Sequence, residues 1–136
     1  MKKKHVLVVD DDKSLLNSLA EILRFEGYEV EIAEGGQEAL EKSKRRFYDL
    51  ALLDAGLPDM EGTELLRRLN DTSPSTVKIM TTDHPSIASV TDALNLGADA
   101  YLIKPLGLRT LVKTIEEKLK ASAQRAPRGV IEKVVG

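Results

Sequence analysis

Residues 50–54 read LALLD, and residues 55–62, which follow directly, read AGLPDMEG. Four consecutive apolar residues are typical of a strand buried on both faces, and a carboxylate stands where this strand ends. The glycines and the proline of the second segment predict a loop in which no regular element continues. Because ligands of open α/β folds bind at the carboxyl ends of the strands, Asp54 is the residue that we expect this fold to present.

The composition predicts one domain of ordinary globular type. The chain has 136 residues, of which 42% are hydrophobic and 31% charged. The net charge of −2 argues against a nucleic-acid or membrane surface as the main partner. Without cysteine and with only two histidines, neither a disulfide framework nor a thiolate or histidine-rich metal site is expected. No apolar run approaches the length of a membrane span, so we expect a cytoplasmic protein.

Around 50–54, apolar patterns of strand type and helix type alternate along the chain. We expect strands at 5–9, 28–32, 50–54, 77–80 and 100–103, and the period-two pattern of 28–32 indicates an edge strand. We expect five helices. The first runs from Lys13 to before Gly27, the third from after Gly62 to before Pro74, and the fifth from about 108 to 119. The second begins at Gly35-Gly36 and carries Ala39, Leu40 and Phe47, and the fourth runs from Pro85-Ser86 to before Gly97 and carries Ile87, Val90, Ala93 and Leu94. Such alternation predicts an α/β fold with a parallel sheet covered on both faces by five helices.

The end of the chain has a different composition. Residues 121–129 resemble a linker, and 130–135 are too few to form a domain. The domain therefore takes up residues 1–120, and 121–136 form a linker or tail. This segment is either a simple tail or the remainder of a connection to an output domain that the chain does not contain.

Polar residues follow the strands at few and specific positions. Asp10 and Asp11 follow the first strand, Asp54 ends the third, Thr82 the fourth, and Lys104 follows the fifth. If the strands are parallel, these side chains meet at one edge of the sheet. Crowded carboxylates raise one another's pKa unless a cation neutralises them, and oxygen ligands without histidine or cysteine suit Mg²⁺.

These groups together predict phosphoryl transfer to a carboxylate. The ion and Lys104 would neutralise the phosphoryl oxygens, the Thr82 hydroxyl would donate to one of them, and Asp54 would attack to form an aspartyl phosphate. Such a reaction asks a protein for little beyond positioning and charge neutralisation.

Three motifs resemble those of response-regulator receiver domains in two-component signalling, of the chemotaxis-regulator type. Residues 8–11 (VVDD) resemble the acidic pair, 54–62 the phosphoacceptor loop, and 97–105 (GADAYLIKP) the closing strand. The resemblance covers residues 5 to about 120. It implies a flavodoxin-like fold with strand order 2-1-3-4-5. It also implies a sensor histidine kinase or histidine phosphotransfer protein as donor, and a downstream output domain or protein as receiver of the signal.

The resemblance also implies a role for each site residue. Asp54 would be the phosphorylation site and Asp11 a direct Mg²⁺ ligand, with Asp10 acting on the metal through water and Gly56 supplying a backbone carbonyl. Thr82 and Tyr101 would be the switch pair and Lys104 the phosphoryl-binding lysine, with a cis bond to Pro105. Such a domain catalyses only its own phosphorylation and dephosphorylation and is not otherwise an enzyme.

One position departs from the family pattern. The residue after the switch threonine is usually small, whereas here it is Asp83. A carboxylate there would repel a donor phosphate or an attacking water, so slow phosphorylation or dephosphorylation is expected. If the switch threonine were Thr81 instead, Thr82 would be the small neighbour and Asp83 would lie farther out.

The expected output is a change of surface. Phosphorylation adds negative charge and acceptor oxygens, so Thr82 would move toward the phosphoryl group and Tyr101 would turn into the space it leaves. That movement would reshape the surface of the fourth helix, fifth strand and fifth helix, through which a homodimer could also form. No direct nucleic-acid or membrane binding by this chain is expected.

Two other functions compete with this one. Asp10-x-Asp12 after an apolar strand has the spacing of haloacid-dehalogenase-type phosphatases, in which Asp10 would be the nucleophile and Asp12 the acid/base. This alternative leaves the Asp54 loop unexplained. The third reading is a degenerate receiver that only binds partners, its chemistry blocked by Asp83.

Overall fold

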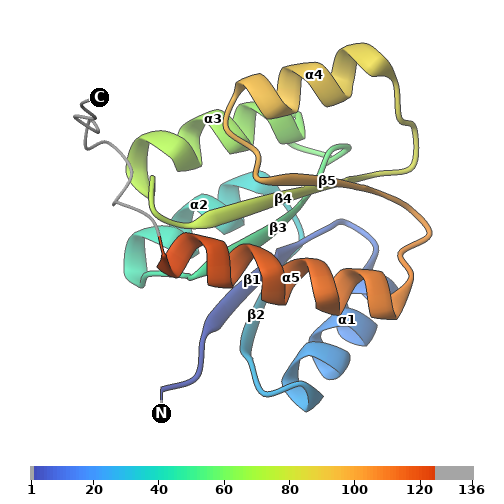
Figure 1. Ribbon diagram of the computed structural model, residues 1–136. Helices are drawn as coiled ribbons and strands as arrows, with labels where there is room; N and C mark the ends of the chain where they lie inside the picture. The colour runs from blue at the N-terminus through green and yellow to red at the C-terminus, as the bar shows by residue number, and fades with distance from the viewer. Residues whose placement is uncertain (1, 125–136) are drawn as a thin grey trace, which may run out of the picture.

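In the computed structural model, which describes residues 2–124, five strands and five helices alternate along the chain (Figure 1). The strands are β1 (His5–Val9), β2 (Glu29–Ala33), β3 (Leu50–Asp54), β4 (Val77–Thr82) and β5 (Ala100–Ile103). The helices are α1 (Lys13–Phe25), α2 (Gly36–Arg45), α3 (Gly62–Thr72), α4 (Ile87–Asn95) and α5 (Leu108–Ala123). The elements follow the predicted order throughout.

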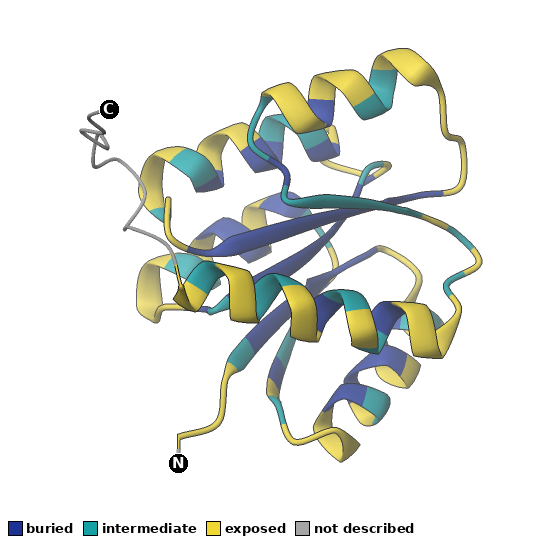
Figure 2. Cartoon of the chain, in the orientation of Figure 1, coloured by how far each residue is buried: buried dark blue, intermediate teal, exposed yellow. Residues whose placement is uncertain are grey.

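The strands form one parallel sheet in the order β2-β1-β3-β4-β5. This arrangement confirms the predicted flavodoxin-like architecture, including β2 as an edge strand. Every residue of β3 and β4 is buried, as expected for central strands of a sheet that is covered on both faces (Figure 2).

Alternate residues of the strands face two separate hydrophobic clusters. On one face, Val8, Leu52 and Ile79 pack with the buried residues of α1 and α5, among them Leu16 and Ile115. On the other face, Leu53 and Met80 pack with α2, α3 and α4. Two helices therefore cover one face and three the other, and the loops that leave the carboxyl ends of the strands stay free to form a site.

Two helices end at glycines in the left-handed region. Gly27, with φ 102°, follows α1, and Gly97, with φ 99°, follows α4. Residues with a Cβ rarely adopt this conformation, so both glycines end their helices where the sequence predicts.

Some element boundaries and faces differ from the predictions. Phe47 lies beyond the end of α2 and is 54% exposed, so it does not belong to that helix's inward face. In α4 only Ala93 is buried, while Ile87 and Leu94 are 87% and 50% exposed. Helix α5 continues to Ala123 rather than to about residue 119, because Ala-Ser-Ala contains nothing that breaks a helix.

A buried lysine in the central sheet was not singled out from the sequence. The side chain of Lys78 on β4 is fully buried, and its Nζ donates a hydrogen bond of 2.6 Å to the carbonyl of Ser73 at the end of α3. A helix carboxyl terminus carries partial negative charge, which stabilises an ammonium group there.

No helix in residues 2–124 is both long enough and apolar enough to cross a membrane. Residues 125–136, which include most of the predicted linker or tail, lie outside the described residues.

Candidate functional site

The site lies at the carboxyl edge of the parallel sheet. β1 runs into Asp10, β3 ends at Asp54, and β4 ends at Thr82. The Lys104 amide, directly after β5, donates to the carbonyl of Thr82 at 2.8 Å, which holds the end of β5 beside the end of β4. The sheet register thus gathers residues from four strands.

Lys104 joins two of the three predicted carboxylates. Its Nζ lies 2.6 Å from Asp10 Oδ2 and 3.2 Å from Asp54 Oδ1. The three side chains are almost inaccessible, with 11% of Lys104, 4% of Asp10 and 8% of Asp54 exposed. Removal from water strengthens charge interactions, so this triad is a strongly coupled group and not a surface ion pair.

Asp11 completes an acidic cluster next to this triad. Carboxylate oxygens of Asp10, Asp11 and Asp54 all lie within 4.8 Å of one another. Asp11 is exposed whereas the other two are buried, so the cluster is open to solvent on the Asp11 side. Three hard oxygen donors with an open side fit Mg²⁺, which keeps several of its waters.

Asp12 has a structural role that differs from those of Asp10 and Asp11. Its side chain caps α1 by accepting from the Leu15 amide at 3.1 Å, and its own amide donates to Asp10 Oδ1 at 3.0 Å. Asp12 therefore caps α1, and its amide and Lys104 bind different oxygens of the Asp10 carboxylate.

The electrostatics favour a cation at this site. Burial raises the pKa of Asp54, the negative charge of Asp10 raises it further, and Lys104 and the Gly56 amide oppose the rise. Burial alone would lower the pKa of Lys104, but the hydrogen bond to Asp10 and the charges of Asp54 and Asp10 outweigh burial and raise it. One ammonium shared by two buried carboxylates, with a third beside them, leaves net negative charge for a divalent ion to neutralise.

The predicted switch residues lie on neighbouring strands. Thr82 is buried, and its Oγ1 accepts from the His84 amide at 3.0 Å. Tyr101 is half-buried, and its hydroxyl lies 3.3 Å from Ser89 Oγ on α4. Thr81, the alternative, pairs with Asp54 in the sheet, and its hydroxyl lies 3.5 Å from the Leu53 carbonyl. The switch role of Thr82 and Tyr101 stays a prediction.

The loop residues of the site are placed as follows. Gly56 is exposed and forms a bridge with Glu61, and its role as a carbonyl ligand stays a prediction. The Lys104-Pro105 peptide bond is cis, which confirms the expectation for it. Asp83 is exposed and lines a hollow that Lys104 also lines.

The comparisons with known proteins agree with this geometry. The family model described as the response regulator receiver domain matches residues 6–116. This chain belongs to the response-regulator receiver family. Receiver membership does not favour the haloacid-dehalogenase alternative built on Asp10.

Two curated relatives are transcriptional regulatory proteins. The receiver chain is 35% identical over 125 residues to the uncharacterized transcriptional regulatory protein YkoG of Bacillus subtilis, which covers 92% of this chain and 55% of the relative. It is 37% identical over 118 residues to the transcriptional regulatory protein TrcR of Mycobacterium tuberculosis, and this match covers 87% of this chain and 46% of the relative. The chain thus spans about half the length of these relatives.

Solved receiver structures match the fold closely. A CheY-like response regulator receiver domain protein from Methanospirillum hungatei superposes with a TM-score of 0.88 at 47% identity, covering 90% of this chain and 98% of that one. The chemotaxis protein CheY4 of Vibrio cholerae gives 0.82 at 32% identity, covering 86% and 99%.

Asp59, in the loop after the site aspartate, has a role that the sequence analysis missed. Its carboxylate accepts from the Gly36 amide at 2.8 Å and from the Gln37 amide at 3.0 Å, and these bonds lower its pKa. It therefore caps α2, whose own N-cap residue, Gly35, has no side chain to do so. The glycine before a helix start was the available signal that a cap had to come from elsewhere.

Gly62 was predicted only as a turn residue, but it is a point of close approach. A Cβ at this position would lie 2.6 Å from both the Asp54 carbonyl oxygen and the Ala55 Cα. The start of α3 therefore packs directly on the backbone that carries Asp54.

Proposed function

We propose that this receiver accepts a phosphoryl group on Asp54 in a Mg²⁺-dependent reaction and that phosphorylation switches its surface. The observation that carries the proposal is the contact of Lys104 Nζ with both Asp54 and Asp10, beside the open acidic cluster. A carboxylate nucleophile, a fixed cation and a set of metal ligands at one edge are what phosphoryl transfer requires.

The carboxylates and the loop would hold the ion. Asp11 and Asp54 would be direct ligands, Asp10 would act through water, and the Gly56 carbonyl would complete the protein's share. When bound, Mg²⁺ supplies positive charge that neutralises the phosphoryl oxygens. The acidic cluster fits such an ion because its oxygens lie within 4.8 Å of one another and one side is open.

In the transfer, an Asp54 carboxylate oxygen forms a bond to phosphorus as the P–N bond to the donor's histidine breaks. The imidazole nitrogen keeps the bonding electron pair and takes a proton from solvent, so the products are an aspartyl phosphate and a neutral histidine. Lys104 moves from Asp54 to a phosphoryl oxygen, and the Thr82 hydroxyl donates to another. Hydrolysis by water later restores the carboxylate and releases phosphate.

The donor we propose is a sensor histidine kinase or a histidine phosphotransfer protein, and the recipient of the signal is an output domain or protein. The contact between Tyr101 and Ser89 connects β5 to α4. Large apolar side chains are exposed on both elements, Ile87 and Leu94 on α4 and Ile103 on β5. Such side chains suit a protein contact, either with an output partner or with a second copy through α4, β5 and α5. A cytoplasmic location and a domain boundary near residue 120 stay predictions.

The test is incubation with Mg²⁺ and acetyl phosphate, followed by peptide mapping by mass spectrometry. The proposal predicts a mass increase of one phosphoryl group on the peptide with Asp54, abolished by EDTA and by Asp54→Asn. Label on Asp10 would support the phosphatase chemistry instead. Absence of label with acetyl phosphate, phosphoramidate and a panel of phosphorylated histidine donors would favour a receiver that only binds partners.

A further inference from the structure

We propose that Asp83 sets the donor specificity of the site: its charge disfavours free, doubly negative phosphodonors more than singly negative ones. This inference rests on the proposed phosphorylation of Asp54. It assigns a function to a carboxylate that the transfer chemistry does not use.

Asp83 shares a hollow of the surface with Lys104. A hollow of about 400 Å³ is lined by Asp83 and Lys104 together with apolar side chains of α1 and of the loop after β5, including Leu15, Leu19 and Leu106. Lys104 is the residue that contacts Asp54 at 3.2 Å. Asp83 therefore lines the same hollow as Lys104, and its negative charge acts on an anion that approaches this lysine.

Asp83 has no evident structural role within residues 2–124. Its side chain is exposed, and within residues 2–124 it makes no hydrogen bond and no ion pair. By contrast, the exposed Asp12 and Asp59 both cap helices. An unpaired carboxylate next to a site for an anion opposes that anion, so its presence suggests a role in choosing the donor.

The net charge of a phosphodonor determines how strongly Asp83 repels it. A doubly negative donor such as acetyl phosphate is repelled by Asp83 while Lys104 attracts it, whereas phosphoramidate, with one net negative charge, is repelled less. A protein donor would offset the same repulsion if it placed a cationic side chain against Asp83.

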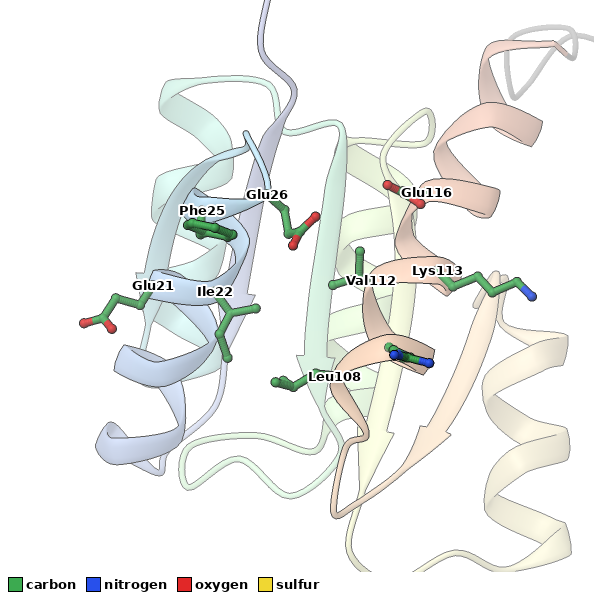
Figure 3. Close-up of a pocket in the computed structure, with 9 residues that line it drawn as sticks. Glu21, Ile22, Phe25, Glu26, Leu108, Val112, Lys113 and Glu116 are labelled. Carbon is green, nitrogen blue, oxygen red and sulfur yellow. The ribbon is translucent and has the colours of Figure 1, made fainter.

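The surroundings of the hollow suit a protein rather than a small molecule. A larger groove of about 750 Å³ between α1 and α5 shares Ile22 and Leu108 with it. Figure 3 shows Ile22 and, on α5, Leu108 and Val112 pointing into the space between these two helices. The apolar surface thus continues away from Asp83, and only a macromolecule covers both parts.

The experiment compares initial rates of Asp54 phosphorylation in the parent, Asp83→Asn, Asp83→Glu and a matched control, Asp71→Asn. Asp71 is also exposed but lies in the last turn of α3, a helix that starts beside the site and runs away from it. All rates are measured with Mg²⁺ and with acetyl phosphate or phosphoramidate, at low and at high ionic strength.

We expect Asp83→Asn to raise the acetyl phosphate rate by about 3- to 10-fold at low ionic strength, with a smaller rise for phosphoramidate and a loss of both rises at high salt. Asp83→Glu and Asp71→Asn should match the parent. Equal rises for both donors, a rise that salt leaves unchanged, or an equal effect of Asp71→Asn would overturn the inference and leave Asp54 phosphorylation intact. Failure of every variant to label Asp54 with either donor would instead overturn the proposed function itself.

Discussion

The ammonium group of Lys104 donates a hydrogen bond of 2.6 Å to Asp10 Oδ2, although 94 positions of sequence separate the two residues. The same ammonium lies 3.2 Å from Asp54 Oδ1, so one cation serves two buried carboxylates. We therefore expect the stability of the domain and its proposed chemistry to depend on the same three side chains.

Replacement of Lys104 by methionine should destabilise the fold. The substitution leaves the buried carboxylates of Asp10 and Asp54 without a counter-charge, and breaking a buried pair in this way costs about 3 kcal/mol. Urea denaturation at pH 7 in EDTA measures the loss. The double variant with Asp54→Asn should regain part of it, because one of the two carboxylates is then neutral. No regain would mean that Lys104 stabilises the fold by packing alone.

Asp54→Asn should stabilise the metal-free protein at neutral pH. Burial and the charge of Asp10 raise the pKa of Asp54, so the folded state binds a proton at Asp54 more tightly than the unfolded state. Ionisation of Asp54 thus destabilises the folded state at pH values above the raised pKa. This loss of stability disappears as the pH falls below the pKa that Asp54 has in the unfolded state. The variant should gain about 1 kcal/mol at pH 7 and little below pH 4, by urea denaturation. A less stable variant at pH 7 would contradict this electrostatic account.

Gly62→Ala should disturb Asp54, the proposed phosphoacceptor, through the backbone. The added methyl group would meet the Asp54 carbonyl oxygen and the Ala55 Cα at 2.6 Å, and forcing them apart costs about 1–3 kcal/mol. Both the melting temperature and the labelling rate of Asp54 should fall. Gly107→Ala is the control, because the nearest atom to a Cβ there, Thr110 Oγ1, lies at an ordinary contact distance of 3.8 Å and the φ of Gly107 is −76°. Equal effects of the two substitutions would show that contact with the Asp54 backbone is not the cause.

Asp59→Ala should weaken the start of α2. Loss of an N-terminal cap typically costs about 0.5–1 kcal/mol, and this side chain accepts from the Gly36 and Gln37 amides. These bonds lower the pKa of Asp59, so its contribution is present above the unfolded pKa and is lost as the pH falls through the lower, folded value. Thermal denaturation between pH 7 and pH 2 should therefore bring the Ala variant and the parent together at the acid end. Asp59→Asn, which keeps an acceptor oxygen, should lose less at pH 7.

Thr82→Ala should separate phosphorylation from the switch. The variant keeps Asp54 and Lys104, so it should still be labelled, but nothing then draws β4 toward the phosphoryl group. We expect the NMR signals of the Tyr101 ring and of Ile103 to shift much less on phosphorylation than in the parent. A variant that takes up phosphate normally and shows the parent's full shifts would refute the coupling.

The sequence predicted the arrangement of the fold and the meeting of the site residues for one reason. Strand direction fixes which ends share an edge, so Asp10, Asp54 and Lys104 could be brought together without any knowledge of side-chain contacts. The burial of β3 was equally clear, because its apolar run is continuous, whereas Lys78 interrupts the run of β4.

Features that depend on tertiary contacts could not be predicted from strand direction or from local apolar patterns. Phe47 fits the helical period of α2, but the helix ends at Arg45, so the ring is left at the surface. Asp59 caps a helix that begins 23 positions earlier, and no local pattern signals such a bond. Ile87 and Leu94 have the spacing of a buried face, yet α4 buries only Ala93 and leaves both exposed.

The central claim is that Asp54, the acidic pair and Lys104 form one Mg²⁺-dependent phosphoryl site. A crystal structure with Mg²⁺ and beryllofluoride, a mimic of the phosphoryl group, tests it most directly. We predict beryllium bonded to an Asp54 carboxylate oxygen, fluorine atoms within hydrogen-bond distance of Lys104 Nζ and Thr82 Oγ1, and the ion on Asp11 and Asp54. Beryllofluoride bound to Asp10, or Lys104 turned away from it, would contradict the account.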